Sequence, residues 1–119
     1  MILLSQVVVA FVAILHVYFL ILEMFLWDRP IGLRAFSQTK ASATSSKILA
    51  ANQGLYNGFL AAGLIWGLLL GAAGHQILLF FLSCIMIAGF FGAITVGRKI
   101  LYIQALPATI GLTLVLLSR

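Results

Sequence analysis

Residues 1–27 read MILLSQVVVAFVAILHVYFLILEMFLW, and this stretch decides the fold class. It is at least as long as the roughly 17 to 25 apolar residues that a membrane-spanning helix needs. It lacks the basic n-region and the small-residue cleavage site of a signal peptide. We therefore expect a retained transmembrane helix over about residues 2–27.

Three further apolar stretches follow, over about residues 48–71, 77–97 and 100–117. The chain is 64% hydrophobic and only 8% charged, well beyond the roughly 45 to 50% apolar content of soluble domains. We expect an all-α membrane protein, a four-transmembrane-helix bundle that forms a single transmembrane domain over residues 1–119. Residues 28–47 form the one long polar connection, with Thr44, Ser45 or Ser46 as candidate N-caps of the second helix.

The basic residues are distributed unevenly among the connections. Six of the seven lie in the first and third connections, and only Arg119 lies on the opposite side. The positive-inside rule then predicts a cell-membrane protein with both basic connections in the cytoplasm and both termini extracytoplasmic. A charge distribution of this kind indicates membrane topology rather than nucleic-acid binding. The six residues are Arg29, Arg34, Lys40, Lys47, Arg98 and Lys99.

Small residues recur at helical spacing in the second and third stretches, where they would let helix backbones approach closely in lipid. Because Gly58 and Gly63 are five residues apart, the two sets in the second helix should face about 140° apart and contact different neighbours. Pro107 should kink the fourth helix and leave the carbonyl of Ile103 without its usual partner. The predicted packing residues are Gly54, Gly58, Gly63, Gly67, Gly71, Gly89, Ala93 and Gly97.

Glu23 is the only acid within any predicted span. His16 precedes it by seven residues, close to two helical turns, so both should share one face about 10 Å apart along the axis. Polar residues of the other spans should lie at similar depth, and we expect a substrate pocket open to the cytoplasm. Its candidate residues are His16, Glu23, Asn52, Gln53, Tyr56, Asn57, Thr95 and Gln104.

A purely structural interpretation of these residues stays open. Amides within membranes also serve only to join helices, at about 0.6 kcal/mol per hydrogen bond on average. The alternative for Glu23 is that it reaches the interface or pairs with Arg29 or Lys47. The sequence carries no zinc-ligand spacing, phosphate loop or Ser-His-Asp order, and Cys84 is its single cysteine, so we expect no metal or cofactor.

Four strings of this sequence are typical of one family: HVYFLILEMFLW at residues 16–27, NQGLYNGFLAAGL at 52–64, AGFFGAITV at 88–96 and QALPA at 104–108. The chain resembles the bacterial and fungal membrane proteins catalogued as domain of unknown function thirteen-zero-four. The resemblance covers essentially the whole chain. It implies a four-span membrane protein of about this length and assigns no activity or functional residues. The family signatures include His16, Glu23, Asn52, Gln53, Asn57 and Gln104 as they stand here.

Three functions remain in competition. The leading hypothesis is binding or transport of a small cationic or polar substrate at Glu23. The ligand could be a small molecule or a lipid. An intramembrane enzyme, such as an isomerase of a lipid-soluble substrate, would use Glu23 and His16 as an acid and base pair. A structural or accessory subunit would use the small-residue ridges to bind other helices in the lipid bilayer, including those of a homo-oligomer.

Overall fold

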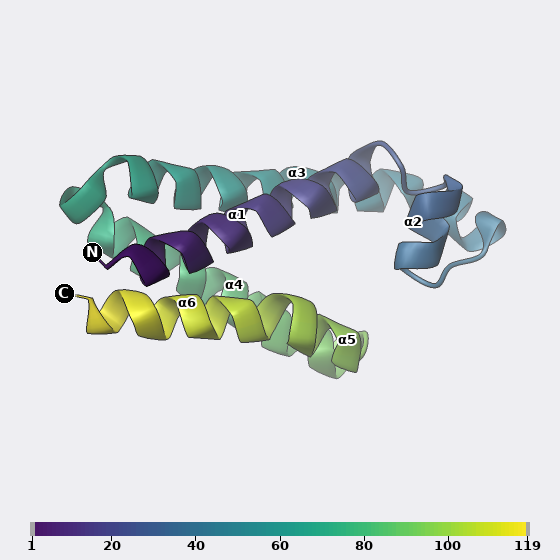
Figure 1. Cartoon of the computed structure of the whole chain (residues 1–119). Helices are drawn as coiled ribbons and strands as arrows, with labels where there is room; N and C mark the ends of the chain where they lie inside the picture. Colours follow the sequence, from purple (N-terminus) through teal and green to yellow (C-terminus); the bar gives the residue numbers. More distant parts are fainter. Residues whose placement is uncertain (1, 119) are drawn as a thin grey trace. The chain divides into compact units, whose positions relative to one another are not determined.

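The computed structural model describes residues 2–118. Within these residues the chain is helical and has no β-strand (Figure 1). In chain order the elements are α1 (Leu3–Met24), α2 (Pro30–Ala35), α3 (Lys40–Leu69), the 3-10 turn η1 (Gly71–Gly74), α4 (His75–Thr95), α5 (Arg98–Ile100), the π-helical turn η2 (Leu101–Ala105) and α6 (Leu106–Leu117).

Three helical segments in the described part of the chain are long and apolar enough to cross a membrane: Leu3–Met24, Gly71–Thr95 and Arg98–Leu117. The expectation of an all-helical, membrane-associated protein is thereby confirmed. Helix α3 is the longest, at 30 residues, but it does not reach the same apolarity. Its amide side chains, among them Asn52 and Asn57, lower its hydropathy.

The helix ends differ from those expected around the polar connection. Helix α1 ends at Met24 rather than near residue 27, and α3 begins at Lys40, eight residues before the expected start at 48. The N-cap is Thr39, whose hydroxyl oxygen accepts the Ser42 amide at 3.1 Å. Thr44, one of the expected caps, lies inside α3 and donates its hydroxyl back to the Lys40 carbonyl at 2.8 Å. Because such hydroxyl groups bond to carbonyls of their own helix, Thr and Ser residues lie within α3, although the sequence analysis placed them in the connection before it.

The chain divides into two compact units, which are described separately. One consists of Leu15–Phe59, and the other combines Met1–Ile14 with Leu60–Arg119. Helices α1 and α3 each contribute residues to both units. The single transmembrane domain expected for the whole chain stays a prediction.

The unit of Met1–Ile14 and Leu60–Arg119 contains a core of aliphatic side chains. Helix α4 packs along α6 and η2 (Figure 1). Helix α3 reaches α4 through two glycines: a Cβ on Gly63 would lie 2.4 Å from the ring of Phe81, and one on Gly67 would lie 2.5 Å from Leu78. The core residues are Val9, Val12, Ala13, Leu64, Leu78, Leu82, Ile85, Ala108 and Val115.

The two glycine sets of α3 contact different helices, as expected. In the unit of Leu15–Phe59, a Cβ on Gly58 would lie 2.6 Å from the Leu20 side chain of α1, whereas Gly63 and Gly67 face α4. Two of the other expected packing residues, Gly71 and Gly97, have nothing within 4 Å of a Cβ. Gly71 begins η1, and Gly97 lies between α4 and α5. Gly71 has a φ of +60°, a left-handed conformation that favours glycine at the turn after α3. Ala93 is partly buried on α4.

A π-helical turn, Leu101–Ala105, precedes Pro107. Because proline clashes with the carbonyl four residues earlier, here that of Ile103, a widened turn at this point relieves the clash. Helix α4 lies directly against this turn: a Cβ on Gly89 would lie 2.6 Å from the backbone nitrogen of Ala105. The chain thus forms a π turn next to Pro107, and Gly89 provides the space for it. The kink expected in the fourth helix stays a prediction.

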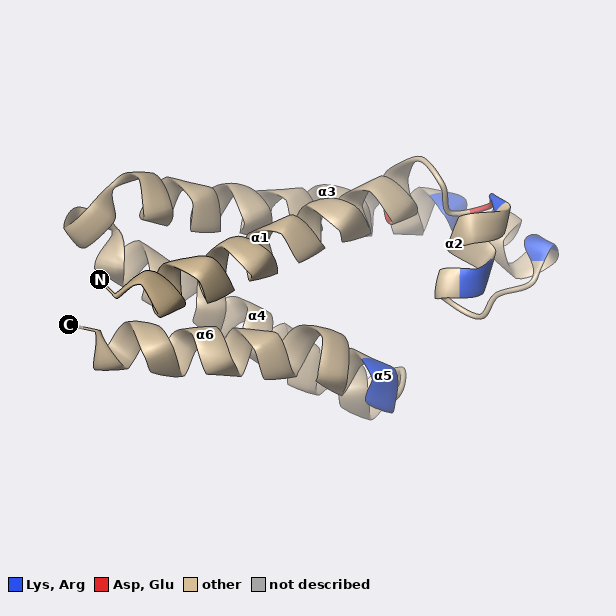
Figure 2. Ribbon diagram, viewed as in Figure 1, with Lys and Arg blue, Asp and Glu red and all other residues tan. Residues whose placement is uncertain are grey.

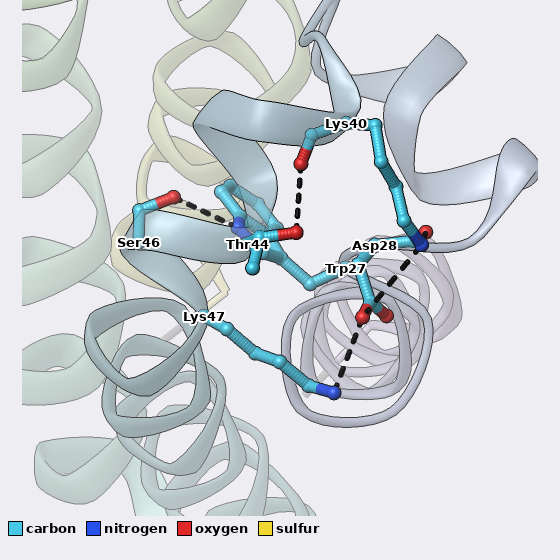
Figure 3. Close-up of polar contacts among 6 residues, drawn as sticks. All are labelled: Trp27, Asp28, Lys40, Thr44, Ser46 and Lys47. Atoms are coloured by element: carbon cyan, nitrogen blue, oxygen red, sulfur yellow. Dashed lines mark hydrogen bonds and ion pairs between the residues drawn. The ribbon is translucent and has the colours of Figure 1, made fainter.

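The polar connection is held to the start of α3 by a set of polar contacts (Figure 3). The Trp27 indole donates to the Ser46 hydroxyl at 3.0 Å and its ring lies 4.8 Å from that of Phe36. Lys47 donates to the Asp28 carboxylate at 3.2 Å, and Lys40 donates to the Asp28 carbonyl at 2.8 Å. The hydrogen bond from Lys47 holds the pKa of Asp28 below its ordinary value of 3.8. These contacts join the end of α1 to the start of α3.

Basic residues gather at particular points in each unit (Figure 2). In the unit of Leu15–Phe59 they lie on and around α2 and at the start of α3. In the other unit Arg98 and Lys99 form α5. Arg119, the one basic residue expected on the opposite side, lies outside the described residues.

We predict that Gly89→Ala destabilises the protein by about 1 to 3 kcal/mol, because the added methyl group would collide with the Ala105 backbone. The control is Gly97→Ala, since Gly97 has extended backbone and open space around it. Thermal unfolding in mild detergent can be followed with a maleimide dye that labels Cys84, the single cysteine. Equal melting temperatures for the two variants would contradict the close contact at Gly89.

We predict that the contact between the Lys47 ammonium group and the Asp28 carboxylate breaks in acid. A carboxyl group whose pKa is lowered in the folded protein stabilises it above its ordinary pKa, and this stabilisation is lost as the pH falls. In a Trp66→Phe background, which leaves Trp27 as the one tryptophan, Trp27 fluorescence should change with a midpoint below pH 3.8. In Asp28→Asn the acid transition should vanish, and a transition that persists there would show that another group controls it.

Candidate functional site

The centre of the candidate site is a pair of buried polar side chains on α1 and α3. Glu23 is 8% exposed and Asn57 is 5% exposed. The Asn57 amide donates a hydrogen bond to the Glu23 carboxyl oxygen Oε1. Because 34 residues separate them in sequence, only the pairing of the two helices brings them together.

Two glycines of α3 allow this pairing. A Cβ on Gly54 would lie 2.6 Å from Met24, 3.1 Å from the Cβ of Glu23 and 3.2 Å from the Leu20 carbonyl. Gly58 is similarly close to the Leu20 side chain. Small residues let helix backbones approach in this way. The Asn57 side chain, which lies between the two glycines in sequence, can therefore reach the carboxyl group on the facing helix.

Lys40 and Lys47 contact Asp28 rather than Glu23. Lys47, one of the two partners considered for it, donates to Asp28 at 3.2 Å, and Lys40 lies 4.0 Å from the same carboxylate. Glu23 meets a neutral amide instead. An amide satisfies one acceptor position of the carboxyl group but supplies no positive charge. Asn57 therefore does not neutralise the negative charge that Glu23 carries when it is ionised.

His16 lies in the same unit as Glu23 and is completely buried. Its ring packs edge-on against Phe19, with the ring centroids 5.3 Å apart. Seven residues of α-helix separate it from Glu23, about 10 Å along the axis. Both residues therefore lie on the buried side of α1.

Three other candidates of α3 lie on its outer side. Asn52, Gln53 and Tyr56 are all exposed, whereas Asn57 is buried. The Asn52 amide donates to the carbonyl of Ile48, one turn earlier, at 3.1 Å. The Tyr56 ring lies 6.4 Å from that of Phe59 on the same helix. These three side chains therefore do not line one pocket together with Glu23 and Asn57.

Thr95 and Gln104 belong to the other unit. Thr95 is exposed and donates its hydroxyl to the Phe91 carbonyl at 2.8 Å, within its own helix. Gln104 is partly buried in the π turn. Of the eight candidates, the structure thus pairs Glu23 with Asn57, and a pocket shared by all eight stays a prediction.

Sequence reasoning missed the role of Asp28. This residue pairs with Lys47, which the sequence analysis considered as a partner of Glu23. The signal was present, since Asp28 is the only acid in a connection that carries four basic residues. Among the described residues, no three His, Cys, Asp or Glu side chains are grouped so that they could hold a metal ion.

The family described as "Protein of unknown function (DUF1304)" matches residues 10–116. The uncharacterized protein YpaA of Lactococcus lactis subsp. lactis (strain IL1403) is 30% identical over 95 residues, which cover 78% of this chain and 80% of that protein. No solved structure matches the chain. The match spans nearly the whole sequence and includes both helices of the Glu23 and Asn57 pair, so the chain belongs to the DUF1304 family.

Proposed function

We propose that this protein binds a small monovalent cation at the Glu23 carboxylate, as part of its transport across the membrane. The observation that carries the proposal is the buried Glu23 carboxyl group held by the neutral Asn57 amide. The neighbouring lysines are occupied by Asp28. A cationic substrate would supply the charge that the Asn57 amide lacks.

The energetics of burial support this role. Moving a carboxylate from water into an apolar environment is costly unless a charge or several hydrogen bonds compensate it. Ionisable residues within membrane segments are for this reason rare, and they commonly mark ion or substrate pathways. Glu23 lies within Leu3–Met24, a segment long and apolar enough to cross a membrane. Binding a cation there would offset the cost of keeping the carboxylate.

The same proposal includes α3 as a fourth span. A helix of 30 residues is about 45 Å long, which exceeds the roughly 30 Å of a hydrocarbon core. Its amides lower its hydropathy, and Asn57 is one of those amides. Four spans would place α2 and α5, with their basic residues, on the cytoplasmic side and both termini outside the cytoplasm.

Two observations favour cation binding over the competing functions. The accessory-subunit hypothesis depends on free glycine ridges, but Gly54, Gly63 and Gly89 are in contact with other helices of this chain. The isomerase hypothesis needs His16 and Glu23 to line one cavity, and the His16 ring is completely buried beside Phe19. Cation binding requires only that the cation can reach the Glu23 carboxylate.

We predict that Glu23→Gln abolishes cation binding, because it removes the negative charge and keeps the size of the side chain. Binding of tetraphenylphosphonium, Na⁺ and K⁺ to the purified protein can be measured by titration calorimetry in mild detergent. Native mass spectrometry of the same samples would detect a co-purified cation. We expect at least one of these cations to bind the wild type and to bind Glu23→Gln at least about tenfold more weakly.

The control is Thr113→Val, at an exposed position of α6 whose hydroxyl bonds to the Thr109 carbonyl of its own helix at 2.9 Å. This variant leaves Glu23, Asn57 and the contacts of Asp28 in place, so cation binding should persist. If no cation binds the wild type, or if both variants bind equally well, the proposed function is wrong. Circular dichroism would establish that each variant keeps its helical content.

We also predict that Glu23 and Asn57 are energetically coupled. Asn57→Ala would leave a buried carboxyl group without its amide partner, at a cost of about 1 to 3 kcal/mol. The same substitution in a Glu23→Gln background should cost measurably less, because the unpartnered group is then uncharged. A double-mutant cycle on the free energy of unfolding measures this difference, and a coupling near zero would show that the hydrogen bond contributes nothing.

A further inference from the structure

The two oxygens of the Glu23 carboxyl group have different surroundings. Oε1 accepts the hydrogen bond from the Asn57 amide. Oε2 accepts none within residues 2–118, and it is not among the fully enclosed polar atoms without a partner, which are Gln38 Oε1 and His75 Nε2. Oε2 therefore keeps exposed surface, although Glu23 as a whole is only 8% exposed. A proton or a small cation can reach the carboxyl group at this oxygen.

The part of α3 that faces Glu23 carries no charge. Asn57 is a neutral amide, and a Cβ on Gly54 would lie 3.1 Å from the Cβ of Glu23. Neither residue has a side chain that gains or loses a proton. Lys47, the basic residue of α3 nearest to Gly54 in sequence, donates to the Asp28 carboxylate at 3.2 Å. Asn57 and Gly54 thus supply neither a proton nor a positive charge to Glu23.

The other two helices of this unit, α1 and α2, carry further ionisable side chains. On α1, His16 is buried about 10 Å from Glu23 along the helix axis, and Tyr18 is exposed. On α2, the Arg34 guanidinium group donates to the Pro30 carbonyl of its own helix at 3.4 Å. His16 is therefore the titratable group that a test of proton binding at Glu23 has to control for.

A carboxyl group at this place has three possible states: ionised and empty, ionised with a bound cation, or protonated. The first state leaves an uncompensated charge, which is costly in apolar surroundings. Because the Asn57 amide supplies no charge, only a cation or a proton avoids this cost. We infer that the Glu23 carboxyl group holds a proton whenever it holds no cation, so that the protein exchanges one cation for one proton. The inference rests on the proposed cation binding at Glu23.

The exchange balances in atoms and in charge. As a cation reaches Oε2, the O–H bond of the carboxyl group breaks, its electron pair stays on the carboxylate, and the proton passes to water. Release of the cation reverses this step. Both states of the site are neutral overall, so neither carries the cost of a bare carboxylate. A positively charged partner in place of Asn57 would remove the need for either ligand, whereas the neutral amide leaves Oε2 to both.

The first test counts the protons that leave when a cation binds. Titration calorimetry with tetraphenylphosphonium, Na⁺ and K⁺ is repeated at about pH 6, where an exposed glutamate is ionised, in two buffers of different ionisation enthalpy. The difference in heat should correspond to about one proton released per bound cation, and the apparent affinity should fall about tenfold for each unit by which the pH is lowered. The measurements stay above pH 3.8, the ordinary pKa of Asp28, so that its contact with Lys47 is kept.

Two variants identify the source of the proton. Thr113→Val leaves Glu23 and Asn57 in place and should release as many protons as the wild type. His16→Gln removes the other buried titratable group of α1, and proton release should persist in this variant as well. Cation binding without proton release in the wild type would overturn the inference. So would a His16→Gln variant that still binds the cation but releases no proton.

A second measurement detects the proton on the carboxyl group directly. Infrared spectroscopy distinguishes the carbonyl band of a protonated carboxyl group from the bands of a carboxylate. The chain has only two acidic side chains, and Asp28, whose pKa lies below 3.8, is ionised at about pH 6. The wild type without a cation should therefore show a protonated-carboxyl band from Glu23, and a saturating cation should remove it.

The infrared band has its own controls. It should be absent from Glu23→Gln and present in Thr113→Val. A wild type that lacks the band when no cation is added would overturn the inference, because Glu23 would then be ionised without a ligand.

The calorimetric outcomes separate this inference from the proposed function. If a cation binds the wild type and no proton leaves, the exchange is wrong and cation binding stands. If no cation binds at any pH, the proposed function is wrong and the exchange is refuted with it.

Discussion

A hydrocarbon environment offers no hydrogen-bond partners, and each polar group of a membrane helix must therefore find its partner within protein. This constraint accounts for much of the structure. Hydroxyl groups of the apolar helices bond to carbonyls of their own helix, as Ser83 does to Leu79 at 2.6 Å and Thr109 does to Ala105 at 2.7 Å. The Glu23 carboxyl group instead accepts a hydrogen bond from the Asn57 amide of a different helix.

Close backbone approach is the means by which the chain meets this constraint. Gly54 lets α3 come near α1, so that a short asparagine side chain can reach the carboxyl group across the helix pair. Gly89 provides the corresponding space for the π turn, where α4 lies against the backbone at Ala105. Van der Waals packing and interhelical hydrogen bonds, rather than a hydrophobic driving force, hold such helices together in lipid. A side chain larger than glycine at these positions would weaken both.

The two acids of the chain differ in their partners. Asp28 bonds to lysines and has a lowered pKa for that reason, whereas Glu23 is buried and bonds to an amide. The clamp of Trp27, Asp28 and Lys47 joins α1 to α3 only a few residues from Glu23. It therefore has two effects: it holds the end of α1 to the first turns of α3, and it pairs Lys47 with Asp28. In the proposed function this leaves the Glu23 carboxylate to a substrate.

The sequence by itself determined the helical class and the apolar segments, because hydrophobic length and helical spacing are local properties. It also predicted the separate neighbours of Gly58 and Gly63. It misplaced the start of α3, since Thr39 caps the helix and hydroxyls back-bond within it. Only the tertiary structure decided that Glu23 meets Asn57 while Lys47 meets Asp28. Those pairings join residues 34 and 19 positions apart, and such distant partners are set by helix packing rather than by any local pattern.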